Sequence, residues 1–113
     1  MISQHNLAGA YRLVGRVAEA VGLYEETLAG MLRVLGSDHP NTLGSQNNLA
    51  NAYQSAGRVE EAIGLYEQTL ADALRVLGAE HPFVAKVRGN LAVARSVTNG
   101  TKRRGFIRKL LGR

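Results

Sequence analysis

The sequence predicts an all-α protein built as a solenoid of antiparallel helix pairs. Three observations indicate this: residues 43–84 repeat the pattern of residues 1–42, apolar residues recur at helical spacing in each copy, and glycine or proline stands where each helix should begin or end. When the two copies are aligned, 26 of the 42 positions are identical. A fixed period of this size is typical of stacked repeats, in which each unit buries its apolar faces against its neighbours.

The second unit, residues 40–81, predicts its two helices from local signals. The first should begin at Pro40, because a proline in the first helical turn lacks only an N–H that has no partner there anyway. Gly57 should end it, as glycine just past a helix commonly does. The second helix is expected from about Val59 to Leu77, with Gly78 ending it. Connections this short predict antiparallel neighbours.

The remaining units follow from the period. Residues 1–39 form the first unit, in which Gly15 matches Gly57 and predicts the same two helices. Residues 82–97 form a partial third unit, so the repeat domain is expected over residues 1–97. Gly22 and Gly64 fall inside second helices, where a glycine costs about 1 kcal/mol relative to alanine. We interpret both as points of close helix contact.

The recurring residues also resemble a known family. Six positions of the first copy return in the second: Leu7, Ala8, Tyr11, Gly15, Ala20 and Tyr24 become Leu49, Ala50, Tyr53, Gly57, Ala62 and Tyr66. This spacing resembles the tetratricopeptide repeat. The long period and the stretch HPNTLGSQNNLANAY are similar to its kinesin-light-chain type, and such arrays are common in bacterial signalling proteins. The resemblance covers residues 2 to about 97 and implies a right-handed α-solenoid of about two and a half units.

The sequence departs from the family pattern at a few positions. Gln4 and Gln46 stand where the family often has tryptophan. Arg95 replaces the tyrosine in the third copy, which argues against a complete third repeat.

The resemblance further implies a non-catalytic scaffold that binds a protein or peptide on the concave face of its first helices. Asparagine suits such a face, since its amide offers two donors and an acceptor to a peptide backbone. Asn6, Asn48 and Asn90 recur once per repeat, and two interpretations stay open for them: ligand contact, or hydrogen bonds that keep the repeats in register. Arg12 and Lys86 favour an acidic ligand. The expected groove residues are Asn6, Arg12, Asn47, Asn48, Asn51, Gln54, Lys86 and Asn90.

Composition and motifs argue against an enzyme, a cofactor and a metal site. The chain has no cysteine, which excludes disulfides and thiolate ligands. His39 and His81 occupy the same HP turn one repeat apart, roughly 10 Å from each other, so we interpret them as helix caps or parts of a solvated turn rather than shared metal ligands. No apolar stretch approaches the roughly 18 residues of a membrane span, and no signal peptide is evident. A cytoplasmic protein is expected.

The basic residues concentrate in a tail, residues 98–113. The last thirteen residues hold six of the fourteen Lys and Arg and no acidic residue, whereas residues 1–100 carry a net charge of −1. The stretch NGTKRRG is expected to break the preceding helix at Asn99–Gly100. Three interpretations stay open: a capping helix over an exposed Leu91, a basic amphipathic anchor for a membrane or a protein, or a disordered basic tail with weak affinity for nucleic acid. A partner would be contacted by Arg103, Arg104, Phe106, Ile107, Arg108 and Lys109.

Two further expectations concern partners. Binding of nucleic acid is not expected, because Phe106 is the tail's one aromatic side chain. Two and a half units fall below the three or so that a repeat array usually needs for stability. The chain is therefore expected to belong to a longer array or to self-associate, and the alternative function is a self-assembly module whose array ends pair between chains.

Overall fold

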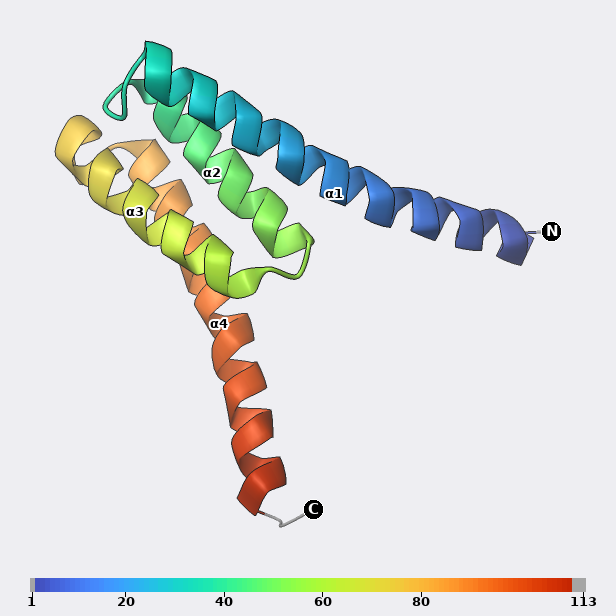
Figure 1. The fold of residues 1–113 in the computed structure, drawn as a ribbon. Helices are drawn as coiled ribbons and strands as arrows, with labels where there is room; N and C mark the ends of the chain where they lie inside the picture. Colours follow the sequence, from blue (N-terminus) through green and yellow to red (C-terminus); the bar gives the residue numbers. More distant parts are fainter. Residues whose placement is uncertain (1, 111–113) are drawn as a thin grey trace.

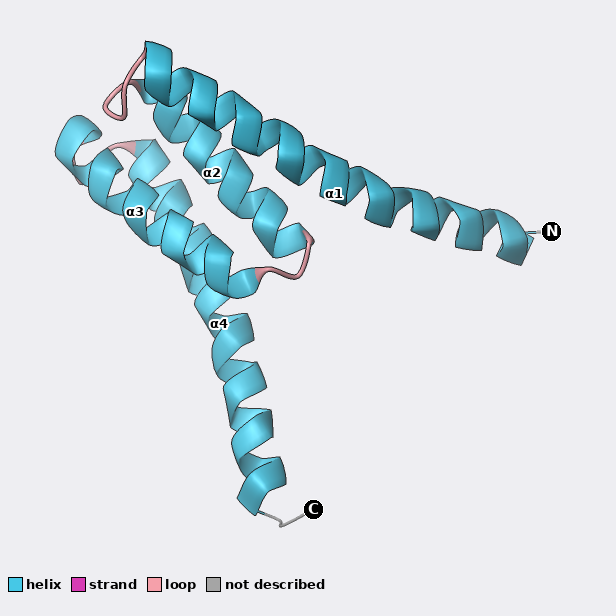
Figure 2. Ribbon diagram, in the orientation of Figure 1, coloured by secondary structure: helices cyan, strands magenta, loops and turns pink. Residues whose placement is uncertain are grey.

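The computed structural model describes the backbone of residues 2–110 and the side chains of residues 15–98. Within these residues the chain forms four helices and no strand: α1 (Ile2–Val34), α2 (Pro40–Ser55), α3 (Val59–Leu77) and α4 (Pro82–Leu110). Each helix packs against the next, and α2 also contacts α4 (Figure 1). Short loops join the helices (Figure 2). The predicted all-α fold of adjacent antiparallel helices is confirmed.

The helix boundaries of the second unit lie where the local signals predict them. His39 caps α2, because its Nδ1 accepts a hydrogen bond of 3.1 Å from the backbone N–H of Asn41. His81 repeats this contact at the start of α4, accepting from the N–H of Phe83 at 3.0 Å. Gly57 adopts a φ of 80°, the left-handed region that favours glycine. The interpretation of both HP histidines as helix caps is confirmed.

Small side chains let α2, α3 and α4 approach one another. Their shared core consists of buried alanines surrounded by larger residues: Ala50, Ala62, Tyr66, Val87, Leu91 and Ala94. A smaller cluster of Val21, Leu49 and Ala52 joins α1 to α2. The α2 helix is thus packed from three sides and lies at the centre of the fold.

One interhelical contact recurs with different chemistry in successive repeats. The Tyr53 hydroxyl donates a hydrogen bond of 2.7 Å to Glu25, which joins α2 to α1. At the equivalent positions of the next repeat, Arg95 forms an ion pair of 2.8 Å with Glu67, which joins α4 to α3. The arginine that departs from the family pattern therefore keeps the same contact between helices.

The first unit differs from the expected pair of helices. The α1 helix continues through Gly15, where the second unit turns at Gly57. A helix that continues through Gly15 keeps its backbone hydrogen bonds. A glycine inside a helix costs only about 1 kcal/mol relative to alanine. The flanking residues also differ, because Leu13 and Val14 replace the Ser55 and Ala56 that lead into the second turn.

The tail also differs from its expected conformation. The α4 helix runs through Asn99–Gly100 to Leu110, so the break expected there does not occur. Residues 101–110 continue α4 instead of forming a separate helix, and they extend away from the other helices (Figure 1). Leu91, which the capping interpretation assumed to be exposed, is already buried by the core that α2, α3 and α4 share.

The interpretation of Gly22 and Gly64 as close-contact points is wrong. A Cβ atom built on either glycine would meet no other heavy atom within 4 Å. Both positions face open space, so no approaching helix requires glycine there.

The open space beside Gly64 and the positive φ of Gly57 predict opposite effects when each glycine is replaced by alanine. Gly64→Ala should raise the free energy of unfolding by about 1 kcal/mol, because alanine favours the helix and the space is empty. Gly57→Ala should lower it by about 1–2 kcal/mol, because a side chain is strained at a positive φ. Urea denaturation followed by circular dichroism measures both. A loss of stability in Gly64→Ala would contradict the open environment of that residue.

Candidate functional site

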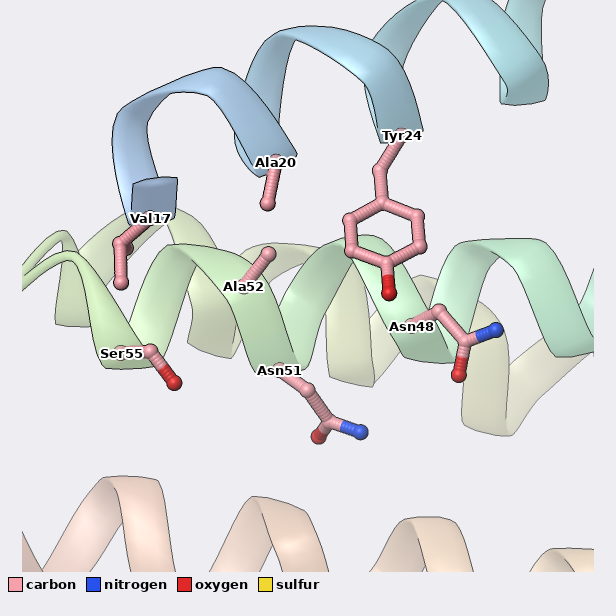
Figure 3. A pocket seen from close by; sticks show the side chains of 7 residues that line it. All are labelled: Val17, Ala20, Tyr24, Asn48, Asn51, Ala52 and Ser55. Carbon is pink, nitrogen blue, oxygen red and sulfur yellow. The ribbon is translucent and has the colours of Figure 1, made fainter. Parts of the chain in front are cut away.

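A pocket of about 240 Å³ lies between α1 and α2. We call it the α1–α2 pocket, and seven residues line it: Val17, Ala20, Tyr24, Asn48, Asn51, Ala52 and Ser55. Ala20 and Tyr24 point from α1 toward α2, and the Tyr24 ring stands over the end of the pocket near Asn48 (Figure 3). One wall is therefore mostly apolar and the other mostly polar.

The polar wall is a single stripe of α2. Asn48, Asn51 and Ser55 follow one another at spacings of three and four residues, which places them on one face of a helix. Asn48 and Ser55 are exposed and Asn51 is half-buried. Both asparagines were expected in a groove, and the structure brings them together at this pocket.

Asn47 lies elsewhere, although it precedes Asn48 directly. Its side chain is only 1% exposed. The Nδ2 group of Asn90 donates a hydrogen bond of 3.2 Å to its Oδ1, and this bond joins α2 to α4. Asn47 therefore holds two first helices together, and its side chain is not available to a ligand. Asn90 matches the interpretation in which asparagines keep the repeats in register.

Gln54 and Asn51 share a buried partner. The Tyr66 hydroxyl donates a hydrogen bond to Oδ1 of Asn51, and Oε1 of Gln54 lies 3.2 Å from the same hydroxyl. Burial raises the pKa of Tyr66 above its usual value. Gln54 thus fixes α2 to α3, whereas Asn51 serves both this contact and the pocket.

Lys86 is the remaining residue of the expected groove whose side chain the structure describes. It is exposed on α4, one turn before Asn90. Val93 and Val97 continue the same stripe of α4 and are 56% and 47% exposed. The side chains of Asn6 and Arg12, and those of Arg103, Arg104, Phe106, Ile107, Arg108 and Lys109, lie outside the described residues.

Comparison of the two repeats identifies residues that the sequence did not mark as a site. Val17, Ala20 and Tyr24 are equivalent to Val59, Ala62 and Tyr66 of the next repeat. Tyr66 is 1% exposed beneath α2, but Tyr24 is 38% exposed at the pocket. The sequence marks both tyrosines as repeat residues; only their neighbours distinguish them.

The described residues contain no metal site and no membrane-spanning helix. Among them, no three His, Cys, Asp or Glu side chains gather closely enough to hold a metal ion. None of the helices, over the residues searched, is both long and apolar enough to cross a bilayer.

Comparisons with known proteins agree with the helical-repeat fold. The family model described as tetratricopeptide repeat matches residues 1–71 and 42–97. A crystal structure of putative kinesin light chain nearly identical TPR-like repeats from Podosopora anserina is 41% identical with a TM-score of 0.72. A form of that protein with one substitution is 40% identical with a TM-score of 0.73. Each comparison covers 88% of this chain and 47% of the other, so this chain spans about half the length of those structures. No curated protein matches the sequence.

The two tyrosine environments predict different costs for removing a hydroxyl. Tyr66→Phe should lower the free energy of unfolding by about 1–2 kcal/mol, because the amide oxygens of Asn51 and Gln54 lose their buried donor. Tyr24→Phe is the matched control and should change it by less than about 0.5 kcal/mol. Urea denaturation measures both. Equal effects at the two positions would contradict the difference in burial.

Proposed function

Because the chain belongs to the tetratricopeptide repeat family, whose members generally mediate protein–protein interaction, we propose that it is a non-catalytic scaffold that binds a protein or peptide. The binding surface is the concave face of its first helices, formed by α2 and the N-terminal part of α4. The observation that supports this most strongly is the polar stripe of α2 at the α1–α2 pocket, where amides and a hydroxyl stand together.

The chemistry of this face fits an extended peptide. Asn51 and Ser55 can exchange hydrogen bonds with a peptide backbone regardless of its side chains. Val93 and Val97 occupy the equivalent positions of α4, and equivalent positions of stacked repeats lie along one face. They offer apolar contact to side chains of the same peptide, since both are exposed. Lys86 at the start of this stripe favours a carboxylate in the ligand.

Two further parts of the proposal concern location and assembly. The chain has no cysteine and therefore no disulfide that would require an oxidising compartment, and we propose that the scaffold acts in the cytoplasm. Self-assembly is the second candidate. Exposed apolar residues on α1 support it, among them Leu23 at 64% and Val34 at 75% exposure.

Selection from a displayed library of random peptides tests the binding face. The full chain should enrich peptides that bind it with micromolar affinity. The double variant Asn51→Ala/Ser55→Ala should weaken a selected peptide at least tenfold, or about 1.4 kcal/mol, measured by calorimetry. Gln68→Ala, an exposed change on α3, is the control and should leave binding unchanged.

Thermal melting of each variant separates lost binding from lost folding. Asn51→Ala leaves Gln54 as an acceptor for Tyr66, so the variant should remain folded. Peptides that bind the double variant as well as they bind the original chain would overturn the assignment of the face.

A further inference from the structure

The α1–α2 pocket is the empty counterpart of a space that a helix fills one repeat later. In that repeat, Ala62 and Tyr66 are buried in a core to which α2 contributes Ala50 and Tyr53. Their equivalents Ala20 and Tyr24 line the pocket instead. A first helix placed across α1 and α2 would therefore bury Tyr24, as α2 buries Tyr66.

Residues 2–14 have the sequence of such a helix. The stretch NLAGAY at residues 6–11 matches NLANAY at residues 48–53 in all but one position. Ala8 and Tyr11 are equivalent to Ala50 and Tyr53, the residues with which α2 fills the space in the next repeat. The backbone of residues 2–14 is already helical.

The straight course of α1 keeps this segment away from the pocket of its own chain. Residues 2–14 continue the axis of α1 beyond the end of α2 (Figure 1). Two such straight helices can pair antiparallel about Gly15. Residues 2–14 of each then lie along the second half of the other α1, beside the partner's pocket. If residues 2–14 folded back within their own chain, they would lie in this same place. The segment of the partner therefore makes the contacts that a folded-back segment would make.

Charge and size agree with this pairing. Residues 2–14 carry Arg12 and no acidic residue, whereas residues 17–28 carry Glu19, Glu25 and Glu26 and no basic residue. These two stretches would lie side by side. Each copy would contribute residues 2–14 and residues 17–28, which together are 25 residues and fall within the roughly 20–30 residues a side that a stable interface contains.

We propose that the chain forms a two-fold symmetric dimer in which residues 2–14 of each copy occupy the α1–α2 pocket of the other. Such an exchange of identical segments needs no new kind of contact, because residues 2–14 would pack on the partner's α1 in the way that α2 packs on α3. The apolar Leu13 and Val14, next to Gly15, fall close to the two-fold axis.

The dimer leaves the proposed ligand face open. Val93 and Val97, the equivalents of Asn51 and Ser55, remain exposed although α2 fills the space beside them. The inserted segment would cover Ala20, Ala52 and Tyr24. The dimer does not rest on the proposed ligand, and the Asn51→Ala/Ser55→Ala variant should still form it, so the two proposals fail separately.

Light scattering on a sizing column, with the full chain at high micromolar concentration, tests the dimer. The expected mass is twice the 12.2 kDa of one chain. Gly15→Ala should keep this mass, because alanine favours the straight helix, whereas a folded-back segment would need a positive φ like that of Gly57. Tyr11→Asp should halve the mass, because a carboxylate cannot replace a tyrosine in the filled pocket.

Circular dichroism checks that Tyr11→Asp remains helical, and Leu7→Asp serves as a second variant of the segment if it does not. Three results would each overturn the proposal: a 12.2 kDa species for the original chain, a monomer for Gly15→Ala, or an unchanged dimer for both segment variants.

Discussion

Burial of Tyr66 beneath α2 is the contact on which the stacking of these helices depends. The ring fills the space between α3 and the first helices beside it, and Asn51 and Gln54 satisfy its hydroxyl. A buried hydroxyl without a partner would cost free energy, and the amides of α2 give this hydroxyl an acceptor where the helix covers the ring. The helix that covers Tyr66 therefore also supplies the polar groups that its hydroxyl needs.

The first repeat lacks a helix that covers the tyrosine equivalent to Tyr66. Tyr24 has the ring of Tyr66 but no covering helix from its own chain, and a pocket remains beside it. The equivalents of Asn51 and Gln54 are Gly9 and Arg12, neither of which has a side-chain acceptor. A segment inserted here would bury the Tyr24 ring without repeating the hydrogen bonds of the second unit.

Local signals in the sequence were sufficient to predict α2 and α3. Pro40, Gly57 and Gly78 act within a few residues of the helix ends that they define, so no distant neighbour is needed. Gly15 and Gly100 carry similar signals, yet the helix continues through both. At Gly15 the preceding Leu13 and Val14 replace the Ser55 and Ala56 that lead into the turn at Gly57, so the glycine alone did not identify a helix end.

The candidate site was predicted in part for a related reason. Asn48 and Asn51 were found because a polar stripe at helical spacing is visible in the sequence. Asn47 was assigned to the same face, but consecutive residues of a helix point about 100° apart, and its side chain enters the contact with α4. The opposite wall of the pocket consists of ordinary repeat residues, and only the missing neighbour makes them a site.

The contacts of Tyr53 with Glu25 and of Arg95 with Glu67 each join residues 28 positions apart. The contact recurs in the next repeat because both partners move along the chain by the same full period. A gene encoding this protein can therefore gain or lose the codons of a whole repeat and keep both this contact and the reading frame. An insertion of any other length within a helix would shift one partner away from the other. Recombination between copies is thus a route by which such a protein changes its length without a new fold.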